Sequence, residues 1–308
     1  MRVRIAFAAA ALISLAGAVP ATAQVDVTTC GQNVGPGQVA TLQADLDCSA
    51  TTGVGLVLET GVTLVLNGFD VIGNPAAPFG THGVVCHGTC TVVGPGAIRD
   101  FASDGMFVED AVRIRGATIR NNGFRGIEGD GFTHMRVDDA VFFGNGGEAL
   151  YTGGGVRVAN TVFDHDGAGI LGYGVRVEDS TFTNNGNGVT SDGKTIIKRC
   201  VFSGNNIAMQ LYKGSVKDCT VENNYQGIGT TTVVVRHSTV RNNDANGIDL
   251  VTAVVRDSVV TGNGSACTDP RFPCADIDTR EQPKVSNTVC EHSLSWQNHT
   301  PWGVCSLD

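Results

Sequence analysis

The hydrophobic and polar residues of the chain form one phrase that recurs about every twenty positions. In the copy "VRVEDSTFTNNGNGV" at 175–189, apolar and polar residues alternate through "VRV" and again through "STF", and a turn rich in asparagine and glycine follows. Alternation with a period of two is typical of β-strands. The pattern therefore predicts short strands joined by tight turns.

Eight copies align on the apolar residue that ends the second run, with steps of 19 to 23 residues between copies. These anchors are Ile119, Phe142, Phe163, Phe182, Phe202, Val221, Val240 and Val260. Three positions after them stand Asn122, Asn145, Asp166, Asn185, Asn205, Asn224, Asn243 and Asn263. Because asparagine tolerates unusual backbone angles and can satisfy buried peptide groups, we expect a buried ladder of amides running from coil to coil.

A period of twenty residues is too short for a strand–helix–strand unit, which takes about 30 or more residues. A further apolar position follows the first seven of these eight residues and indicates a third strand; it holds Ile127, Ala149, Ile170, Val189, Met209, Ile228 and Ile248. The sequence thus predicts an all-β fold, a right-handed parallel β-helix of about ten coils with three short strands per coil. A leucine-rich repeat has similar asparagine spacing, but leucine is scarce at these positions and the rest of each period is too glycine-rich for a helix.

The chain divides into three segments. Residues 1–23 have the features of a signal peptide (Arg2 and Arg4, an apolar run, and an A-x-A site at 21–23), so we expect an exported protein, secreted or periplasmic, cleaved after Ala23. Residues 24–264 are assigned to the β-helix. From 265 to 308 the period stops, and prolines, tryptophans and four cysteines predict a disulfide-tied cap on the last coil.

Ten cysteines in an exported chain favour disulfides over a reduced metal cluster. Proximity in the sequence predicts the pairs Cys30–Cys48, Cys86–Cys90, Cys267–Cys274 and Cys290–Cys305. Cys200 and Cys219 occupy equivalent inward positions of neighbouring coils, where they are either stacked core residues or a disulfide between coils.

The formal charge is −9, and removal of residues 1–23 deletes two arginines and no acids, leaving 19 basic against 30 acidic residues, or −11. This acidity argues against nucleic acid as a partner. No later stretch has the roughly 20 apolar residues of a membrane-spanning helix. We therefore expect a protein without membrane insertion, and a monomer.

Three stretches carry a family resemblance: "LVLNGFDVIG", "VVGPGAIRDF" and the repeated "xVxNNxxGI" phrase. Over residues 30–264 the chain resembles secreted bacterial parallel β-helix repeat proteins of the pectate-lyase-like superfamily, of the NosD and carbohydrate-binding and sugar-hydrolase type. The resemblance implies a fold more than a reaction. It also implies that a polysaccharide binds along the outside of the strand that starts at the "G-I" position, and along the loops beside it.

Counting outward positions on that strand gives two rows. The first holds Glu128, Leu150, Leu171, Thr190, Gln210, Gly229 and Asp249, and the second holds Asp130, Thr152, Tyr173, Asp192, Tyr212, Thr231 and Val251. Tyr173 and Tyr212 lie two coils apart, about 9.6 Å, and tyrosine faces suit sugar rings. We therefore expect Tyr173, Tyr212, Glu128, Gln210 and Asp249 to bind substrate, although exposed tyrosines without a ligand are also common on β-surfaces.

Catalysis has four candidate residues, Asp130, Asp192, Lys194 and Lys213. Paired carboxylates, either Glu128 with Asp130 or Asp192 with Asp249, would suit a glycoside hydrolase. A lysine base beside a charge-neutralising group would suit a polysaccharide lyase, and Ca²⁺ is a cofactor only in that case. The motifs of polygalacturonases and alginate epimerases are missing, no metal site is indicated, and a non-catalytic structural surface protein remains a third alternative.

A column of bases is predicted on the "VRV" strand. It contains Arg113, Arg136, Arg157 and Arg176 and continues one step over with Lys198, Lys217, Arg236 and Arg256. An acidic glycan could lie along this column. Because acids interleave with the bases, a solvated face of weak ion pairs is the other interpretation, and the one that the sequence favours.

Overall fold

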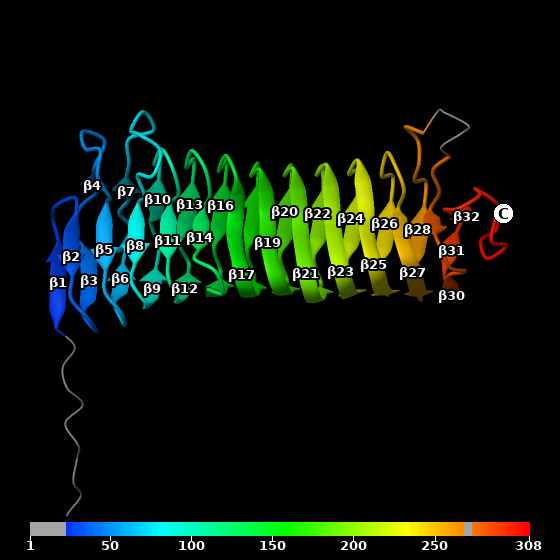
Figure 1. The fold of residues 1–308 in the computed structure, drawn as a ribbon, viewed down its shortest axis with the longest axis horizontal. Coiled ribbons are helices and arrows are strands. Elements are labelled where there is room, and N and C mark those ends of the chain that lie inside the picture. Colours follow the sequence, from blue (N-terminus) through cyan, green and yellow to red (C-terminus); the bar gives the residue numbers. More distant parts are fainter. Residues whose placement is uncertain (1–22, 268–272) are drawn as a thin grey trace, which may run out of the picture.

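A computed structural model describes residues 23–267 and 273–308; residues 1–22 of the predicted signal peptide lie outside this range. The described chain winds into a rod of parallel strands without any helix among these residues (Figure 1). Each turn contributes one strand to each of three columns, which we number in the order in which the chain passes through them. None of the described residues forms a helix long and apolar enough to cross a membrane.

Column 1 contains the strand that starts at the "G-I" position. Its separate strands are β2 (Gln32–Val34), β5 (Leu56–Leu58), β8 (Val84–Cys86), β11 (Met106–Val108), β14 (Ile127–Gly129), β29 (Ile277–Thr279) and β32 (Ser293–Ser295). Column 2 contains the "VRV" strand. Its separate strands are β1 (Gln24–Val27), β3 (Val39–Leu42), β6 (Thr63–Val65), β9 (Thr89–Val93), β12 (Ala111–Arg115), β15 (His134–Asp138) and β30 (Lys284–Ser286).

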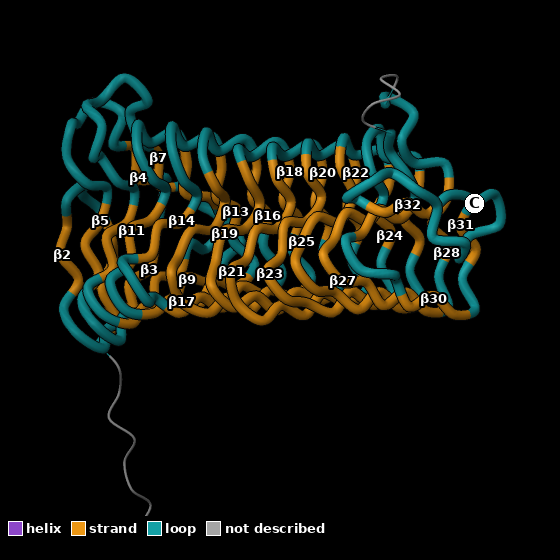
Figure 2. Tube along the Cα trace, turned by 45° about the vertical axis from the view of Figure 1, so that its right-hand side comes forward, coloured by secondary structure: helices purple, strands orange, loops and turns teal. Residues whose placement is uncertain are grey.

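In the middle of the rod, columns 1 and 2 join into single bent strands. These are β17 (Glu148–Ala159), β19 (Ala168–Glu178), β21 (Asn187–Lys198), β23 (Ile207–Lys217), β25 (Gln226–Arg236) and β27 (Ile248–Arg256). Figure 2 shows strand running almost without interruption through this bend, whereas loops gather along the edge between columns 3 and 1. The bend therefore separates two outward faces that share the same strands.

Column 3 forms a 12-stranded parallel sheet of its own. Its strands are β4 (Leu46–Asp47), β7 (Val71–Ile72), β10 (Ala97–Arg99), β13 (Thr118–Arg120), β16 (Val141–Phe143), β18 (Val162–Asp164), β20 (Thr181–Thr183), β22 (Val201–Ser203), β24 (Thr220–Glu222), β26 (Thr239–Arg241), β28 (Val259–Thr261) and β31 (Val289–Cys290).

The rod has about 13 turns, which corrects the expected ten. The count was low because the irregular ends of the chain also coil. Column 2 already begins at β1, which pairs with β3. In the Cys-rich segment 265–308, β29, β30 and β31 continue all three columns by pairing with β27 and β28, and β32 adds a further strand to column 1.

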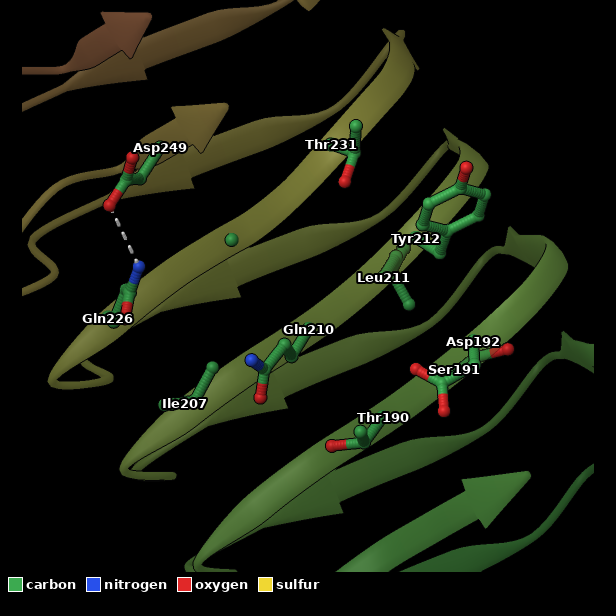
Figure 3. A pocket seen from close by; sticks show the side chains of 11 residues that line it. Thr190, Ser191, Asp192, Ile207, Gln210, Leu211, Tyr212, Gln226, Thr231 and Asp249 are labelled. Carbon is green, nitrogen blue, oxygen red and sulfur yellow. Dashed lines mark hydrogen bonds between the residues drawn. The ribbon is translucent and has the colours of Figure 1, made fainter. Parts of the chain in front are cut away.

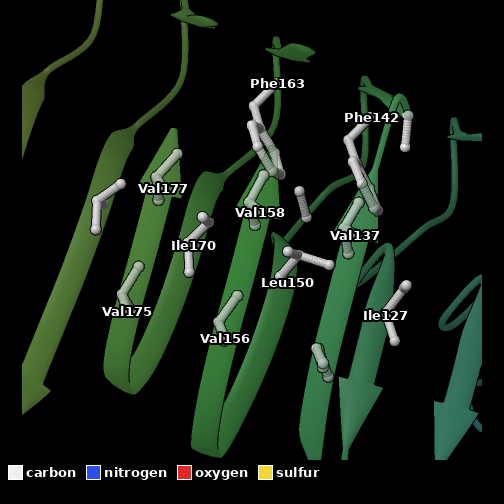
Figure 4. Packing of buried hydrophobic residues seen from close by; sticks show 14 of the residues in the cluster. Ile127, Val137, Phe142, Leu150, Val156, Val158, Phe163, Ile170, Val175 and Val177 are labelled. Atoms are coloured by element: carbon white, nitrogen blue, oxygen red, sulfur yellow. The ribbon is translucent and has the colours of Figure 1, made fainter. Parts of the chain in front are cut away.

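The core consists of like side chains stacked on one another. In column 3 the rings of Phe163 and Phe182, and of Phe182 and Phe202, stack with centroids 4.6 Å apart and nearly parallel planes. Phe142 stacks on Phe163 at 5.1 Å. Valines and isoleucines of columns 1 and 2 pack against this stack (Figure 4). The ring separations are close to the strand spacing of about 4.7–4.9 Å, so the hydrogen-bonded backbone sets the packing distance of the core.

The predicted ladder of buried amides is confirmed. The side-chain amide of Asn185 donates to Asn205 Oδ1 at 3.1 Å, Asn205 donates to Asn224 Oδ1 at 2.9 Å, and Asn224 donates to Asn243 Oδ1 at 3.0 Å. Each oxygen also accepts the backbone N–H of the preceding coil's asparagine. The ladder ends at Asp276, whose Oδ1 accepts from Asn263 and whose Oδ2 accepts the backbone N–H of Glu291.

All four predicted disulfides are present: Cys30–Cys48, Cys86–Cys90, Cys267–Cys274 and Cys290–Cys305. Four such bonds indicate that the protein folds in an oxidising, non-cytoplasmic compartment. Cys200 and Cys219 are free and buried. They stack as core residues, with Cys219 Sγ accepting the backbone N–H of Cys200 at 3.5 Å, which decides between the two alternatives left open by the sequence.

Candidate functional site

A groove of about 460 Å³ lies on the outer face of column 1, across β21, β23, β25 and β27. We call it the column-1 groove. Its polar lining includes Asp192, Gln210, Tyr212, Gln226 and Asp249, and Figure 3 shows their side chains on successive strands. Each strand contributes one outward residue at a given register, so every coil adds its own set of functional groups to the groove.

The chain presents these groups through local irregularities of the bend. Gly193 is buried between the exposed residues Asp192 and Lys194, and a Cβ at Gly193 would lie 1.6 Å from the carbonyl oxygen of Tyr173. Only glycine permits this close approach of two strands. The register shifts here, between Ser191 and Lys194, so Asp192 lines the column-1 groove while Lys194 lines a different groove on column 2.

The structure brings together three of the five residues expected to bind substrate. Tyr212, Gln210 and Asp249 all line the column-1 groove. Tyr173 is 64% exposed and stands one coil beyond the groove lining. Glu128 lies farther along the same outward row, at β14, and its carboxylate already contacts Arg125 Nη1 at 2.7 Å.

The four expected catalytic residues do not converge in one place. Asp130 is an exposed turn residue between β14 and β15. Lys213 is paired in register with Lys194 on column 2, away from Asp192. Asp192 and Asp249 are three coils apart, about 14 Å at the strand spacing, which exceeds the roughly 6.5–9.5 Å between the carboxyl groups of inverting glycosidases.

Two positions of the predicted outward rows need correction. Leu150, rather than Ala149, pairs with both Ile127 and Ile170 and points into the core, so Tyr151 takes the outward position between Glu128 and Leu171. Thr152 is buried, and its hydroxyl donates to the carbonyl of Thr133 at 2.6 Å. The turn before β17 holds one residue more than the turn before β19. Counting outward positions at the spacing of the later copies therefore assigned those of β17 one residue too early.

A carboxylate pair that the sequence did not reveal closes one end of the groove. Asp249 and Asp278 are direct partners on β27 and β29, so their Cα atoms are about 4.8 Å apart. Burial and the negative charge of Asp249 raise the pKa of Asp278 to about 7, and burial also raises the pKa of Asp249. Gln226 Nε2 donates to Asp249 at 3.3 Å and Asn246 Nδ2 donates to Asp278 at 3.4 Å. The pair therefore retains a proton close to neutral pH.

An aromatic residue lies beside this pair. Trp296, in the C-terminal segment, lines a smaller hollow with Asp249 and Arg280, and the Arg280 guanidinium stands over the indole ring at 4.2 Å from its centroid. The backbone N–H of Trp296 donates to the carbonyl of Thr279, which ties the tryptophan to β29. The segment predicted as a cap thus supplies an aromatic wall next to Asp249.

A second charged cluster surrounds Glu128. His82 Nδ1 lies 3.0 Å from Asp104 Oδ2, and Arg125 Nε donates to Glu148 at 2.9 Å. Burial, followed by a hydrogen bond with Asp104, raises the pKa of Glu128. Burial also acts to raise the pKa of Asp104, but hydrogen bonds from His82 and the Arg125 backbone outweigh it and lower that pKa. Arg125 and His82 thus already engage Glu128 and Asp104, so both carboxyl groups have their polar partners within the protein.

Comparison with known proteins gives one match. Residues 158–270 match the family model described as "Right handed beta helix region", a span that includes much of the column-1 groove. No curated protein and no solved structure is significantly similar to the chain. The parallel columns and this match agree that the described chain folds as a parallel β-helix.

Proposed function

We propose that the protein is exported and binds a polysaccharide in the column-1 groove, as its resemblance to pectate-lyase-like β-helix proteins implies. The observation that carries this proposal is the lining of the groove, in which the 61%-exposed ring of Tyr212 lies among carboxylate and amide groups. A tyrosine ring can pack on the apolar face of a sugar, and carboxylates and amides hydrogen-bond its hydroxyl groups. Asp192 and Asp249 favour an uncharged glycan, since they would repel an anionic one.

The test is retention of the mature protein on a panel of neutral and uronate-containing polysaccharides, followed by calorimetry with oligosaccharides of the glycan that retains it. Tyr212→Ala should weaken binding about tenfold, the loss of about 1.4 kcal/mol that one stacking contact provides. Tyr225→Ala is the matched control, because Tyr225 is 55% exposed and lies outside the groove lining. Equal affinities of the two variants, or no retention on any glycan, would contradict the proposal.

Hydrolysis of the bound glycan is a second candidate, favoured by the Asp249–Asp278 pair. In-register side chains on neighbouring strands run parallel, so the carboxyl groups are separated by roughly the 5–5.5 Å found in retaining glycosidases. Asp249 lines the groove and would donate its proton to the glycosidic oxygen, whereas Asp278 is only 3% exposed and would return a proton to Asp249. The lyase alternative, with Asp130, Asp192, Lys194 and Lys213, stays a prediction that no shared groove supports.

The second candidate is tested by following reducing ends and unsaturated products. Reducing ends alone, lost in Asp249→Asn and falling in wild type as the pH rises through about 7, would support hydrolysis with the proton held by the pair. Asp192→Asn should weaken binding without abolishing turnover. Unsaturated ends would favour the lyase alternative instead, and binding without any cleavage would leave a binding protein.

A further inference from the structure

The outward face of column 2 gathers the positive charge of the chain. Eight successive column-2 segments, from β12 to the second half of β27, contain eleven of the 21 lysines and arginines and only two of the 30 acidic residues. These segments are 111–115, 134–138, 155–159, 174–178, 194–198, 213–217, 232–236 and 252–256. Eleven positive and two negative charges give this face a net +9, in a chain whose formal charge is −9.

Four arginines form one row on this face. Arg113, Arg136, Arg157 and Arg176 are partners in consecutive strands, so they repeat every 4.8 Å or so along the rod. All four line a groove of about 770 Å³, together with His134, Lys194 and two glycines, Gly155 and Gly174. We call it the arginine groove. Its floor is low where the glycines lie, because they are adjacent in register and carry no side chain.

The acids on this face do not neutralise the row. Asp138 lies 2.9 Å from Arg136 and 3.6 Å from Arg113, and Glu178 lies 2.6 Å from Arg176. These arginine side chains are about half exposed, so such pairs contribute roughly 0–1 kcal/mol and exchange readily with a ligand. Arg157 forms no ion pair within residues 23–267 and 273–308. The row thus keeps a positive field that two carboxylates only partly offset.

Exposed rings border the same groove at the bend between columns 1 and 2. Phe132 is 83% exposed and Tyr173 is 64% exposed, and they precede the groove residues His134 and Gly174 by two positions and one position. A linear polymer along the groove would therefore meet cations on one side and aromatic edges on the other. Sugar rings suit such edges, and a planar guanidinium suits a carboxylate or sulfate.

We propose that the arginine groove binds a linear anionic polysaccharide lengthwise along the rod. Its carboxylate or sulfate groups contact the arginine row, and its sugar rings pass over Gly155 and Gly174. A chain whose anionic groups repeat about every 5 Å, near the strand spacing, can engage several arginines at once. This site is distinct from the column-1 groove, whose aspartates select against the same ligand, so either proposal can fail without the other.

Two kinds of variant separate a seated ligand from diffuse attraction. Arg136→Gln, Arg157→Gln and Arg176→Gln together remove three charges from the groove. The matched control removes three charges elsewhere, at Arg120, Arg199 and Arg241, each also changed to Gln. Gly155→Leu with Gly174→Leu keeps every charge but fills the floor; a Cβ at these glycines has no neighbour nearer than 3.5 Å and 3.9 Å, so the strands accept it.

The measurement is equilibrium binding of a labelled polyuronate and a labelled sulfated glycan at several salt concentrations, with duplex DNA as a third ligand. We expect at least one anionic glycan to bind wild type and the control alike, the arginine variant tenfold or more weakly with a flatter salt dependence, and the leucine variant at least fivefold more weakly. Preference between the two glycans identifies the anionic group. Tyr212→Ala should leave this binding unchanged.

Three outcomes of the variant and DNA measurements would overturn the proposal. They are equal weakening in the control and the arginine variant, wild-type affinity of the leucine variant, and duplex DNA binding as tightly as either glycan. The first two would show attraction to overall charge rather than seating in the groove, and the third would show a general polyanion surface. Absence of binding to both glycans would overturn it as well. Circular dichroism of each variant verifies that the fold is kept.

Discussion

Asp166 occupies the place of an amide in the ladder of buried asparagines. Its Oδ1 accepts the backbone and side-chain N–H groups of Asn145, both at 2.8 Å, as an asparagine oxygen would. Its Oδ2 stands where a donating NH₂ is found in the other coils and has no hydrogen-bond partner among the described residues. Burial raises the pKa of Asp166 to about 7. At neutral pH this carboxyl group is thus close to the point where it loses the proton that lets it donate like an amide.

Asp166→Asn should stabilise the protein above pH 7. The folded-state pKa of Asp166 lies above the unfolded value, so its contribution is complete below about pH 4 and is lost as the pH rises through about 7. Asparagine restores a donor at every pH, and we expect a gain of roughly 2 kcal/mol at pH 8 and a small effect at pH 4. Urea unfolding at the two pH values measures it.

Asp164→Asn is the control with the opposite sign. Burial acts to raise the pKa of Asp164, but hydrogen bonds from Thr183, His165 and Asn184 outweigh it and lower this pKa. Its contribution is therefore present at neutral pH and lost in acid, so Asp164→Asn should destabilise at pH 8. A destabilised Asp166→Asn variant at pH 8 would show that the ladder uses an ionised Asp166.

The strands of column 3 are stabilised mainly by their inward side chains, which stack on those of the neighbouring coils. Each has only two or three residues and one inward side chain, and such strands have little stability alone. The sequence predicted the anchors of this column because every copy repeats the same inward residue at the same place. It did not predict that columns 1 and 2 join into strands of nine to twelve residues, because that depends on how the chain bends between the columns, as at Gly154 in β17 and Gly193 in β21.

Phe182→Ala should destabilise the protein by about 3–5 kcal/mol, because it removes a fully buried ring and leaves a cavity between two others. Phe132→Ala is the comparison, since Phe132 is 83% exposed and should change stability by less than about 0.5 kcal/mol. Denaturant unfolding at constant slope measures both. Similar losses for the two variants would mean that the stack contributes nothing beyond the strand hydrogen bonds.

At the scale of the molecule, each coil contacts only its neighbours, and the two ends need closing. At the C-terminal end, Leu294 and Pro301 form an antiparallel bridge, and Ser295 donates to the carbonyl of Thr300. This hairpin covers the last strand of column 1, and the Cys290–Cys305 disulfide ties it to column 3. A covered edge protects the sheet from pairing with other chains.

Replacing Cys290 and Cys305 by alanine should open the C-terminal coil alone. Loss of a disulfide that closes a loop of this size removes about 3 kcal/mol of stabilisation. Because each coil interacts only with its neighbours, most of the effect should stay in the terminal coil. Hydrogen exchange should become faster in β29 to β32 and stay slow in β19 to β23. Faster exchange along the whole rod would indicate a single cooperative unit.

The interior of this protein was determined by the sequence itself. A period near twenty, with its phenylalanines and asparagines in step, requires like residues to stack, since identical coils satisfy one another's apolar and hydrogen-bonding groups. The four disulfides also followed from cysteines that are near in sequence.

The tertiary structure alone decided the outside. Because the turn before β17 has an extra residue, Tyr151 rather than Leu150 lies on the surface. Because the register shifts between Ser191 and Lys194, Asp192 and Lys194 line different grooves. The stretch "DIDT" around Asp278 repeats the stretch "GIDL" around Asp249. The two are 29 residues apart, well beyond the period of about twenty, so the repeat is not evident in the sequence. Inward positions are constrained by their copies above and below, whereas outward positions face water and are brought together only by bends and register.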